Sequence, residues 1–193
     1  MKCFPIRAAT LLMTMLMGAP IARAADDLAP GRQAALLLRV LPYDRTLKQR
    51  AREAVTVAVL HRDGQVASAA YAIDMTAALQ DFARAVRVRG LPVRVIGLPY
   101  SSPEKLEAEL TRAQVTAAYV CPGLTDVSET LMDITRRRKI LTFSGRESDI
   151  REHFSIGLIR RGTKAALLVN LPEAQAEGAE LEPEMLAMSE VLR

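Results

Sequence analysis

The sequence predicts a single α/β domain: a mixed, mostly parallel sheet of about six strands flanked by helices, with a C-terminal antiparallel hairpin and a final helix. Short apolar runs alternate with helix-like segments, and these runs begin near residues 57, 93, 117 and 140. Such spacing is typical of βα units joined by right-handed crossovers. Two later β-rich runs, Phe154–Ile159 and Ala165–Val169, are separated by the polar tetrad Arg160–Thr163. They predict a hairpin that forms an antiparallel edge of the sheet.

The first 24 residues have the three parts of a secretory signal. The segment starts with basic residues, continues with the apolar run 8–17 and ends in small residues. An apolar run of about ten residues is too short to span a bilayer core of about 30 Å as a helix. The pattern predicts a signal peptide over 1–24, cleaved between Ala24 and Ala25. We therefore expect export of a domain over 25–193 to the periplasm.

Charge and cysteine content narrow the classes of function. Three of the 26 basic residues lie in the predicted signal peptide, so the remaining 23 face 22 acidic residues. The predicted mature chain is thus nearly neutral, which gives no support to nucleic-acid binding. Cys121 is the one cysteine beyond that segment, so an internal disulfide is excluded. A buried, hydrophobe-like role fits Cys121 better than a catalytic thiol, because Pro122 follows directly, and an intermolecular disulfide stays open.

The first part of the domain predicts two helices and one strand. The Ala- and Leu-rich stretch Arg32–Leu41 indicates a helix that is buried on most sides. The continuous apolar character of Val55–Leu60 favours a strand buried on both faces, as in a parallel sheet. Ala69–Arg89 predicts a long helix that Gly90 caps. The apolar stripe of this helix consists of Met75, Leu79, Phe82 and Val86.

The alternation of strands and helices continues to the hairpin. The further elements are the strand Pro92–Leu98, the helix Pro103–Arg112, the strand Ala117–Cys121, the helix Asp126–Arg138 and the strand Ile140–Phe143. A charged turn, Arg146–Glu152, precedes the hairpin. Beyond the hairpin, Pro183 suits the first turn of a final helix that opens at Glu182. Docking of this helix on the domain is predicted by its apolar stripe, Leu181, Met185, Met188 and Leu192.

We recognise no residue pattern for catalysis, metal binding or cofactor binding. His61 and His153 are 92 residues apart, so the usual spacing of transition-metal ligands is missing. The sequence around Ser144 lacks the first glycine of a nucleophile elbow, and no glycine-rich phosphate loop is present. The densest positive patch, Arg136–Lys139, fits a solvated helix end, where cations oppose the helix dipole. An acidic partner surface is the alternative interpretation of this patch.

One candidate surface follows from the predicted topology. Ligands of open α/β sheets collect beyond the carboxyl ends of the strands. In this chain those ends lie at residues 62–63, 100–101, 122–125 and 144–147. The candidate ligand or partner contacts there are Tyr100, Ser144, Arg146 and Glu147. The alternative is that these segments are ordinary solvated loops.

Several core segments resemble the YfiR family of exported bacterial regulators. They are Leu41-Pro42-Tyr43, Ile140-Leu141-Thr142-Phe143-Ser144, Ser155-Ile156-Gly157-Leu158-Ile159, Leu168-Val169-Asn170-Leu171-Pro172 with Ala174 and Gly178, and Met185-Leu186-Ala187-Met188. The resemblance extends over residues 34–191, almost the whole predicted mature chain.

The resemblance implies a periplasmic, non-enzymatic α/β protein. Such a protein binds and represses the periplasmic domain of an inner-membrane diguanylate cyclase, and its release raises cyclic di-GMP and promotes biofilm formation. An outer-membrane protein and a second copy of the chain are further candidate partners, whereas nucleic acid, cofactors and a membrane-spanning segment are not implied. Two other hypotheses stay open: a small-solute-binding module that uses the strand ends, and a hydrolase that uses Ser144 and Glu147.

Overall fold

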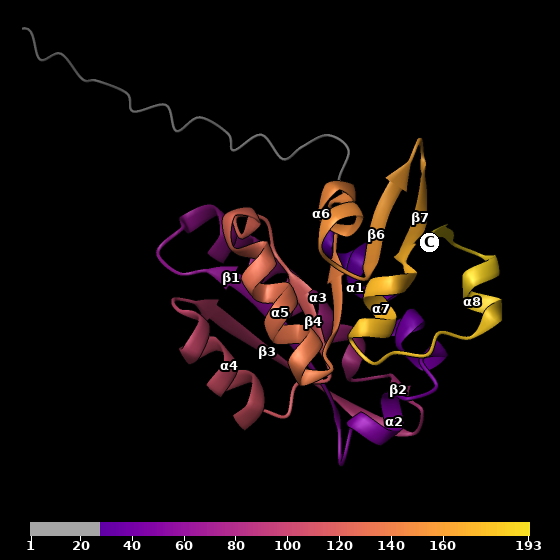
Figure 1. Ribbon diagram of the computed structural model, residues 1–193, viewed down its shortest axis with the longest axis horizontal. Coiled ribbons are helices and arrows are strands. Elements are labelled where there is room, and N and C mark those ends of the chain that lie inside the picture. Colours follow the sequence, from indigo (N-terminus) through magenta and orange to yellow (C-terminus); the bar gives the residue numbers. More distant parts are fainter. Residues whose placement is uncertain (1–27) are drawn as a thin grey trace, which may run out of the picture.

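The computed structural model describes residues 28–193, so the predicted signal peptide lies outside the described residues. The described chain forms one α/β unit around an eight-stranded sheet of order β2-β3-β1-β4-β5-β6-β7-β8 (Figure 1). The strands are β1 Val55–Arg62, β2 Arg87–Val88, β3 Leu91–Tyr100, β4 Ala117–Val120, β5 Leu141–Ser144, β6 Ile156–Arg161, β7 Lys164–Asn170 and β8 Glu190–Leu192. The predicted fold class is confirmed, with two more strands than expected.

The centre of the sheet is parallel. Val57 of β1 lies opposite Val95 of β3 on one side and Ala117 of β4 on the other. The strands β4, β5 and β6 continue the parallel arrangement, whereas β2–β3 and β6–β7 are antiparallel hairpins. The chain runs from β1 to β3 on one side and then crosses to β4 on the other. The carboxyl ends of β1 and β4 therefore flank the point where strand order reverses, which is the usual ligand crevice of such folds.

Helices cover both faces of the sheet. They are α1 Pro30–Val40, α2 Leu47–Arg50, α3 Val66–Ala83, α4 Pro103–Arg112, α5 Ser128–Arg138, α6 Glu147–Glu152, α7 Leu171–Ala176 and α8 Pro183–Ala187, with the 3-10 turns η1 Leu41–Tyr43 and η2 Thr125–Val127. One core contains Leu37 of α1 and Met75 of α3, and the other contains Leu106 of α4, Leu131 of α5 and Ile150 of α6. Figure 1 shows α4 and α5 in front of the sheet.

Local sequence signals set several of these boundaries. Residues Val55–Leu60 are all buried, as their continuous apolar character predicts. The first turn of α4 begins at Pro103, and the Ser102 hydroxyl accepts a hydrogen bond from the Lys105 backbone N–H at 3.3 Å. Three arginines close α5, where their charge opposes the helix dipole.

The predicted helix Ala69–Arg89 is wrong at both ends. The helix α3 runs from Val66 to Ala83, and Arg87–Val88 then forms β2. Gly90 is no helix cap, because it lies with φ +86° in the two-residue turn between β2 and β3, beside Arg89 at φ +49°. Two successive left-handed residues suit a tight hairpin. The hairpin buries Val88 in the core, which a continued helix would not do.

The C-terminal region also differs from the sequence prediction. The charged turn before the hairpin contains α6, and α7 follows the hairpin, with the Asn170 side chain capping it through the Glu173 N–H at 3.3 Å. The final helix ends at Ala187, after which β8 pairs in parallel with β7. The β6–β7 hairpin is consequently not the edge of the sheet. Met185 of the predicted stripe is buried, whereas Met188 is 64% exposed.

Candidate functional site at the strand ends

The candidate site is a row of side chains across the carboxyl ends of β3, β1, β4 and β5. We call Arg62, Thr125, Asp126 and Arg146 the rim. The Arg62 guanidinium lies 5.5 Å from the centroid of the Tyr100 ring and pairs with Asp126. The Arg146 side chain donates a hydrogen bond to the Thr125 hydroxyl at 3.2 Å. Both arginines therefore converge on the segment that follows β4.

Contacts with the start of α3 hold two of the rim segments in place. The Ser68 hydroxyl accepts a hydrogen bond from the Arg62 backbone N–H at 3.0 Å, which fixes the end of β1 to α3. Gly123, in the segment after β4, has φ +97°, and a Cβ there would lie 2.1 Å from the Gln65 Oε1 atom. Only glycine fits this position without displacing its neighbour.

Two of the four predicted contact residues are buried. Tyr100 keeps 6% of its surface exposed and Ser144 keeps 1%. The Ser144 hydroxyl donates to Asp149 at 2.8 Å and accepts from the Arg146 backbone N–H at 3.2 Å. Ser144 is thus placed to hold the segment that carries Arg146, and Tyr100 is placed beneath Arg62. Direct contact of either residue with a ligand stays a prediction.

The other two predicted contacts are accessible but do not act together. Arg146 faces the rim, whereas Glu147 pairs with Arg151 and Arg161. Arg161 also pairs with Glu190 of β8, so Glu147 links α6 with the hairpin and the last strand. Hydrogen bonds from Arg161 and then from Arg151 lower the pKa of Glu147 to about 2. Its carboxylate is already satisfied within the chain.

The positive run at the end of α5 is also paired internally. Arg136 donates to Glu173 of α7, while Arg137 and Arg138 both pair with Glu107 of α4. Lys139, at φ +55°, donates from Nζ to the Ala176 carbonyl at 2.9 Å. The structure thus uses this run to fasten α4 and α7 to α5.

Sequence reasoning missed a polar cluster behind the rim. The Tyr119 hydroxyl donates to Gln33 Oε1 at 2.5 Å, and Gln33 Nε2 donates to the Tyr71 hydroxyl at 2.9 Å. A Cβ on Gly145 would lie 2.6 Å from the same Gln33 oxygen, so this glycine allows α1 to approach the end of β5. The available signal was Gln33 itself, a polar residue on the buried face of an Ala- and Leu-rich helix.

A second missed cluster lies at the opposite end of the sheet. The fully buried Glu177 carboxylate accepts from the Thr142 backbone N–H at 2.8 Å, from the Thr142 hydroxyl at 3.1 Å and from the Ser155 hydroxyl. We call Thr142, Ser155 and Glu177 the α7 cluster. Burial raises the pKa of Glu177 to about 7, against the opposing effect of these hydrogen bonds. Glu177 follows α7 between Ala176 and Gly178, where nothing in the sequence distinguishes it from an exposed acid.

Three properties of residues 28–193 bear on thiol chemistry, metal binding and membrane insertion. Cys121 is buried, and burial raises the pKa of its thiol. In this part of the chain we find no group of three or more His, Cys, Asp or Glu residues that could hold a metal ion. None of its helices has the length and apolar character that crossing a membrane requires.

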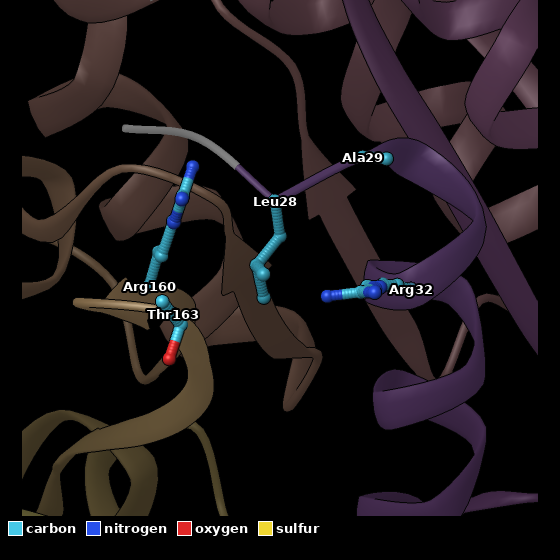
Figure 2. A pocket seen from close by; sticks show the side chains of 5 residues that line it. All are labelled: Leu28, Ala29, Arg32, Arg160 and Thr163. Carbon is cyan, nitrogen blue, oxygen red and sulfur yellow. The ribbon is translucent and has the colours of Figure 1, made fainter. Parts of the chain in front are cut away.

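A separate pocket lies between the start of α1 and the β6–β7 hairpin. Its volume is about 390 Å³, and it is lined by Leu28, Ala29, Arg32, Arg160 and Thr163. Figure 2 shows Leu28 between the side chains of Arg160 and Arg32. Arg160 Nε donates to the Gly162 carbonyl at 2.7 Å. The pocket therefore has arginines from two elements in its wall.

Solved structures with a similar fold include one described as a substrate-binding protein. The ABC domain from Streptococcus pneumoniae in complex with L-Trp aligns with a TM-score of 0.57 and 14% identity, over 86% of this chain and 63% of that one. A conserved domain protein from Vibrio cholerae gives 0.59 and 13%, over 86% and 61%. The ligand-free substrate-binding protein CD0873 from Clostridium difficile gives 0.52 and 13%, over 77% and 57%.

These likenesses concern the fold, because the identities are low. The chain spans about three fifths of the length of the structures it matches. None of the curated proteins compared with the sequence matches it significantly. The model of the YfiR/HmsC-like family, in contrast, matches residues 32–190, nearly all of the described chain. The protein therefore belongs to the YfiR/HmsC-like family.

Proposed function

We propose that this protein is a periplasmic regulatory binding protein that represses a membrane signalling protein of the diguanylate cyclase type. The observation that carries the proposal is the match of the YfiR/HmsC-like family over residues 32–190. The predicted signal peptide supports export. Repression requires no chemical step, since a protein that binds one receptor conformation more tightly shifts the receptor towards it.

The rim is the docking surface in this proposal. The side chains of Arg62 and Arg146 are 25% and 40% exposed, so both can be reached from solvent. The ion pair of Arg62 with Asp126 and the hydrogen bond of Arg146 to Thr125 are exposed interactions of the kind that contribute little to stability. Arg62 also lies over the Tyr100 ring, and Arg146 also lies 3.9 Å from the nearly buried Asp149. A partner carboxylate could replace these contacts at small cost and bind each guanidinium through two hydrogen bonds. The expected receptor surface is therefore acidic.

A complementation assay tests both parts of the proposal. In a strain that lacks the gene, we expect cyclic di-GMP to rise, and the full-length chain should restore the low level. The Arg62→Ala, Arg146→Ala double variant should fail to restore it at equal protein abundance. Arg112→Ala is the matched control, because Arg112 is a highly exposed arginine of α4 away from the rim. Full repression by the double variant would exclude the rim, and unchanged cyclic di-GMP in the deletion strain would exclude the cyclase as target.

Export is tested by the N-terminus of the protein recovered from cells. Cleavage between Ala24 and Ala25 leaves Ala25 as the first residue, and mass spectrometry of the periplasmic fraction would detect it. An uncut N-terminus in the cytosolic fraction would contradict the proposed location. This measurement does not depend on the identity of the receptor.

A small-solute-binding module is the second candidate. It is favoured by the pocket between α1 and the hairpin, which has Arg32 and Arg160 in its wall. Guanidinium groups select carboxylates, so the expected solutes are small organic acids or amino acids. Thermal shift against such a panel should reveal a stabilising compound, and Arg32→Ala should abolish the shift while the exposed Arg39→Ala of α1 retains it. A flat response to the whole panel would remove this candidate.

A further inference from the structure

The outer side of β3 is open over most of its length. On its inner side, β3 pairs with β1 over residues 93–100. On its outer side, β2 pairs only with Leu91 and Pro92. Among residues 28–193 no other strand lies beside β3, so the sheet ends there with a long stretch of unpaired strand. We call residues 93–99 the β3 edge.

The backbone groups that the β3 edge offers can be identified from its pairing. The Tyr100 carbonyl accepts a hydrogen bond from the Asp63 N–H, just beyond β1, at 3.2 Å, so it points towards β1. Backbone groups alternate in direction along a strand, so the N–H and C=O groups of Val95 and Gly97 point outward. Pro99 has the same parity, and proline is tolerated where the missing N–H would face away from the sheet. The outward groups therefore have no strand to bond with.

The side chains along the β3 edge leave room for a further strand. Val93 packs against the core under α1 and α3, whereas Ile96 packs against the core under α4, and both are only half-buried. Gly97 is exposed and has no side chain that would hinder the approach of another backbone. A strand added at this edge would cover both half-buried side chains and bond to the outward backbone groups.

The charge around this edge is entirely positive. Residues 82–103 include four arginines and no acidic residue. Arg87 and Arg94 are exposed, and neither forms an ion pair with another described residue. Arg87 lies opposite Pro92, two positions before Arg94, so the two arginines are diagonal neighbours on one face of the sheet. An extended segment beside β3 would therefore run past two unpaired guanidinium groups.

The charge decides which kind of strand fits. A second copy is disfavoured, because pairing β3 with β3 would bring two basic edges together. Exposed charges and proline at a sheet edge also oppose pairing with neutral strands. An acidic segment gains charge-assisted hydrogen bonds to Arg87 and Arg94 in addition to the bonds between backbones. The edge thus selects its occupant by charge.

We propose that the β3 edge binds an extended, acidic segment of a partner protein, which joins the sheet as a further strand beside β3. Carboxylates of the segment contact Arg87 and Arg94, and its apolar side chains cover Val93 and Ile96. This inference goes beyond the docking at the rim, because it uses a different surface and does not require the partner to be a cyclase.

Selection from a display library of random peptides of about ten residues tests the chemistry of the occupant. The target is the protein expressed from its full coding sequence. We expect acidic peptides to be enriched, and fluorescence anisotropy should show that Arg87→Glu, Arg94→Glu weakens their binding roughly tenfold or more. Arg112→Glu, at an exposed arginine of α4, is the matched control and should bind normally. No enrichment, or enriched peptides that bind the double variant equally well, would overturn the proposal.

Reversal of both charges separates lost attraction from damaged folding. An enriched peptide whose acidic residues are replaced by lysine should bind Arg87→Glu, Arg94→Glu and not the unmodified protein. Failure of this peptide to bind a double variant with an unchanged circular dichroism spectrum would contradict the role of the two arginines.

Amide hydrogen exchange measured by NMR tests the geometry. The enriched peptide should slow the exchange of the outward Val95 and Gly97 N–H groups, which exchange rapidly in the free protein. Gly97→Pro removes one of these donors and should abolish binding. Gly97→Ala should retain it, since a Cβ there has only an ordinary contact with Thr76, at 3.8 Å. Unchanged exchange with peptide bound, or protection without peptide that grows with protein concentration, would overturn the proposal, the latter by showing that a second copy covers the edge.

Discussion

The two ends of the sheet carry polar groups of opposite character. At the carboxyl ends of the strands, the rim residues Arg62, Asp126 and Arg146 are exposed to solvent to different degrees. At the other end, Glu177 of the α7 cluster is fully buried, and its Oε1 atom has no hydrogen-bond partner in the described structure. Both ends are rich in hydrogen bonds, but only one of them can exchange its partners with a second molecule.

The polar groups at the two ends of the sheet therefore differ in role: the exposed ones are available for binding, and the buried ones are required for folding. Exposed ion pairs contribute about 0–1 kcal/mol, so breaking those of the rim would cost little in the docking that we propose. Each buried polar group left without a partner costs about 1–3 kcal/mol, so the α7 cluster must stay intact. Glu177 connects the end of α7 with β5 and with the segment before β6, and the Thr46 hydroxyl donates to the neighbouring Gly178 carbonyl at 2.7 Å. This end therefore fastens the C-terminal region to the body of the protein.

Replacing Glu177 should have the largest effect on stability. Glu177→Ala leaves the Thr142 N–H and the Ser155 hydroxyl without their acceptor in a buried site. We expect a loss of about 3 kcal/mol or more in the free energy of unfolding, measured in urea at pH 6. Glu180→Ala, at an exposed acid on the same segment, should stay within about 0.5 kcal/mol. Equal stability of the two variants would remove the distinction between the two ends.

The pH dependence of stability sharpens the same comparison. Burial raises the pKa of Glu177 from 4.5 to about 7, so between these values the folded chain holds a proton that the unfolded chain has released. The stabilisation of the folded chain by the protonated Glu177 carboxyl is full below pH 4.5 and is lost as pH rises through 7. The unmodified protein should therefore lose on the order of a few kcal/mol between pH 5 and pH 8, relative to Glu177→Gln.

Glu147 affects stability in a different pH range, so Glu147→Gln serves as the reference for Glu177→Gln. Its pKa is lowered from 4.5 to about 2 by Arg161 and Arg151, so its contribution is present above pH 4.5 and is lost as pH falls through 2. Glu147→Gln should therefore be less stable than the unmodified protein near neutrality by a constant amount, and this difference should shrink as pH falls from 4.5 to 2. If Glu177→Gln keeps the same slope as the unmodified protein from pH 5 to pH 8, another group is responsible.

Ser144 should show an intermediate effect. Ser144→Ala removes the donor to Asp149 in a buried site and the acceptor of the Arg146 N–H in a partly buried one. We expect a loss of about 1–2 kcal/mol in thermal or chemical unfolding. Ser101→Ala, at an exposed serine near the end of β3, is the control. A variant of normal stability that fails in the cyclic di-GMP assay would instead make Ser144 a direct contact.

The rim arginines should have the smallest effect on stability. Arg62→Ala removes an exposed ion pair and a contact with the Tyr100 ring. Arg146→Ala removes an exposed hydrogen bond and a 3.9 Å ion pair with Asp149. Each should change the free energy of unfolding by about 1 kcal/mol or less. The same variants should lose repression in cells, which dissociates binding from folding. A loss of several kcal/mol in urea unfolding would show that the rim is structural, and the contrast between the two ends would fail.

Most of the fold was predictable because its signals are local. The strand at Val55–Leu60 and the start of α4 at Pro103 were predicted correctly from neighbouring residues. The end of α3 was missed because its helical pattern continues through Val86, whereas in the folded chain Val88 is buried in the core as part of the β2 hairpin. The strand β8 was missed for a similar reason, since its three residues form a strand only beside β7.

The position of the candidate site was predictable from the sequence, but the burial and the hydrogen bonding of its side chains were not. Sheet topology directed attention to the strand ends, and Arg146 is accessible there. The contact of Tyr100 with Arg62 and the hydrogen bond of Ser144 to Asp149 are set by the folded chain. No spacing in the sequence links Glu177 with Thr142, 35 positions away.

The sequence by itself determined the α/β class, the order of its main elements and the family, because strands, helix caps and apolar stripes are encoded by residues within a few positions of one another. The tertiary structure alone decided which charged side chains form ion pairs within the chain and which remain accessible to a partner. The three arginines at the end of α5 find their counter-ions on other elements, as Arg138 does with Glu107, 31 residues away. Glu147 pairs with Arg161 of β6 as well as with Arg151 of its own helix. Charges pair through space, and only the folded chain sets those distances.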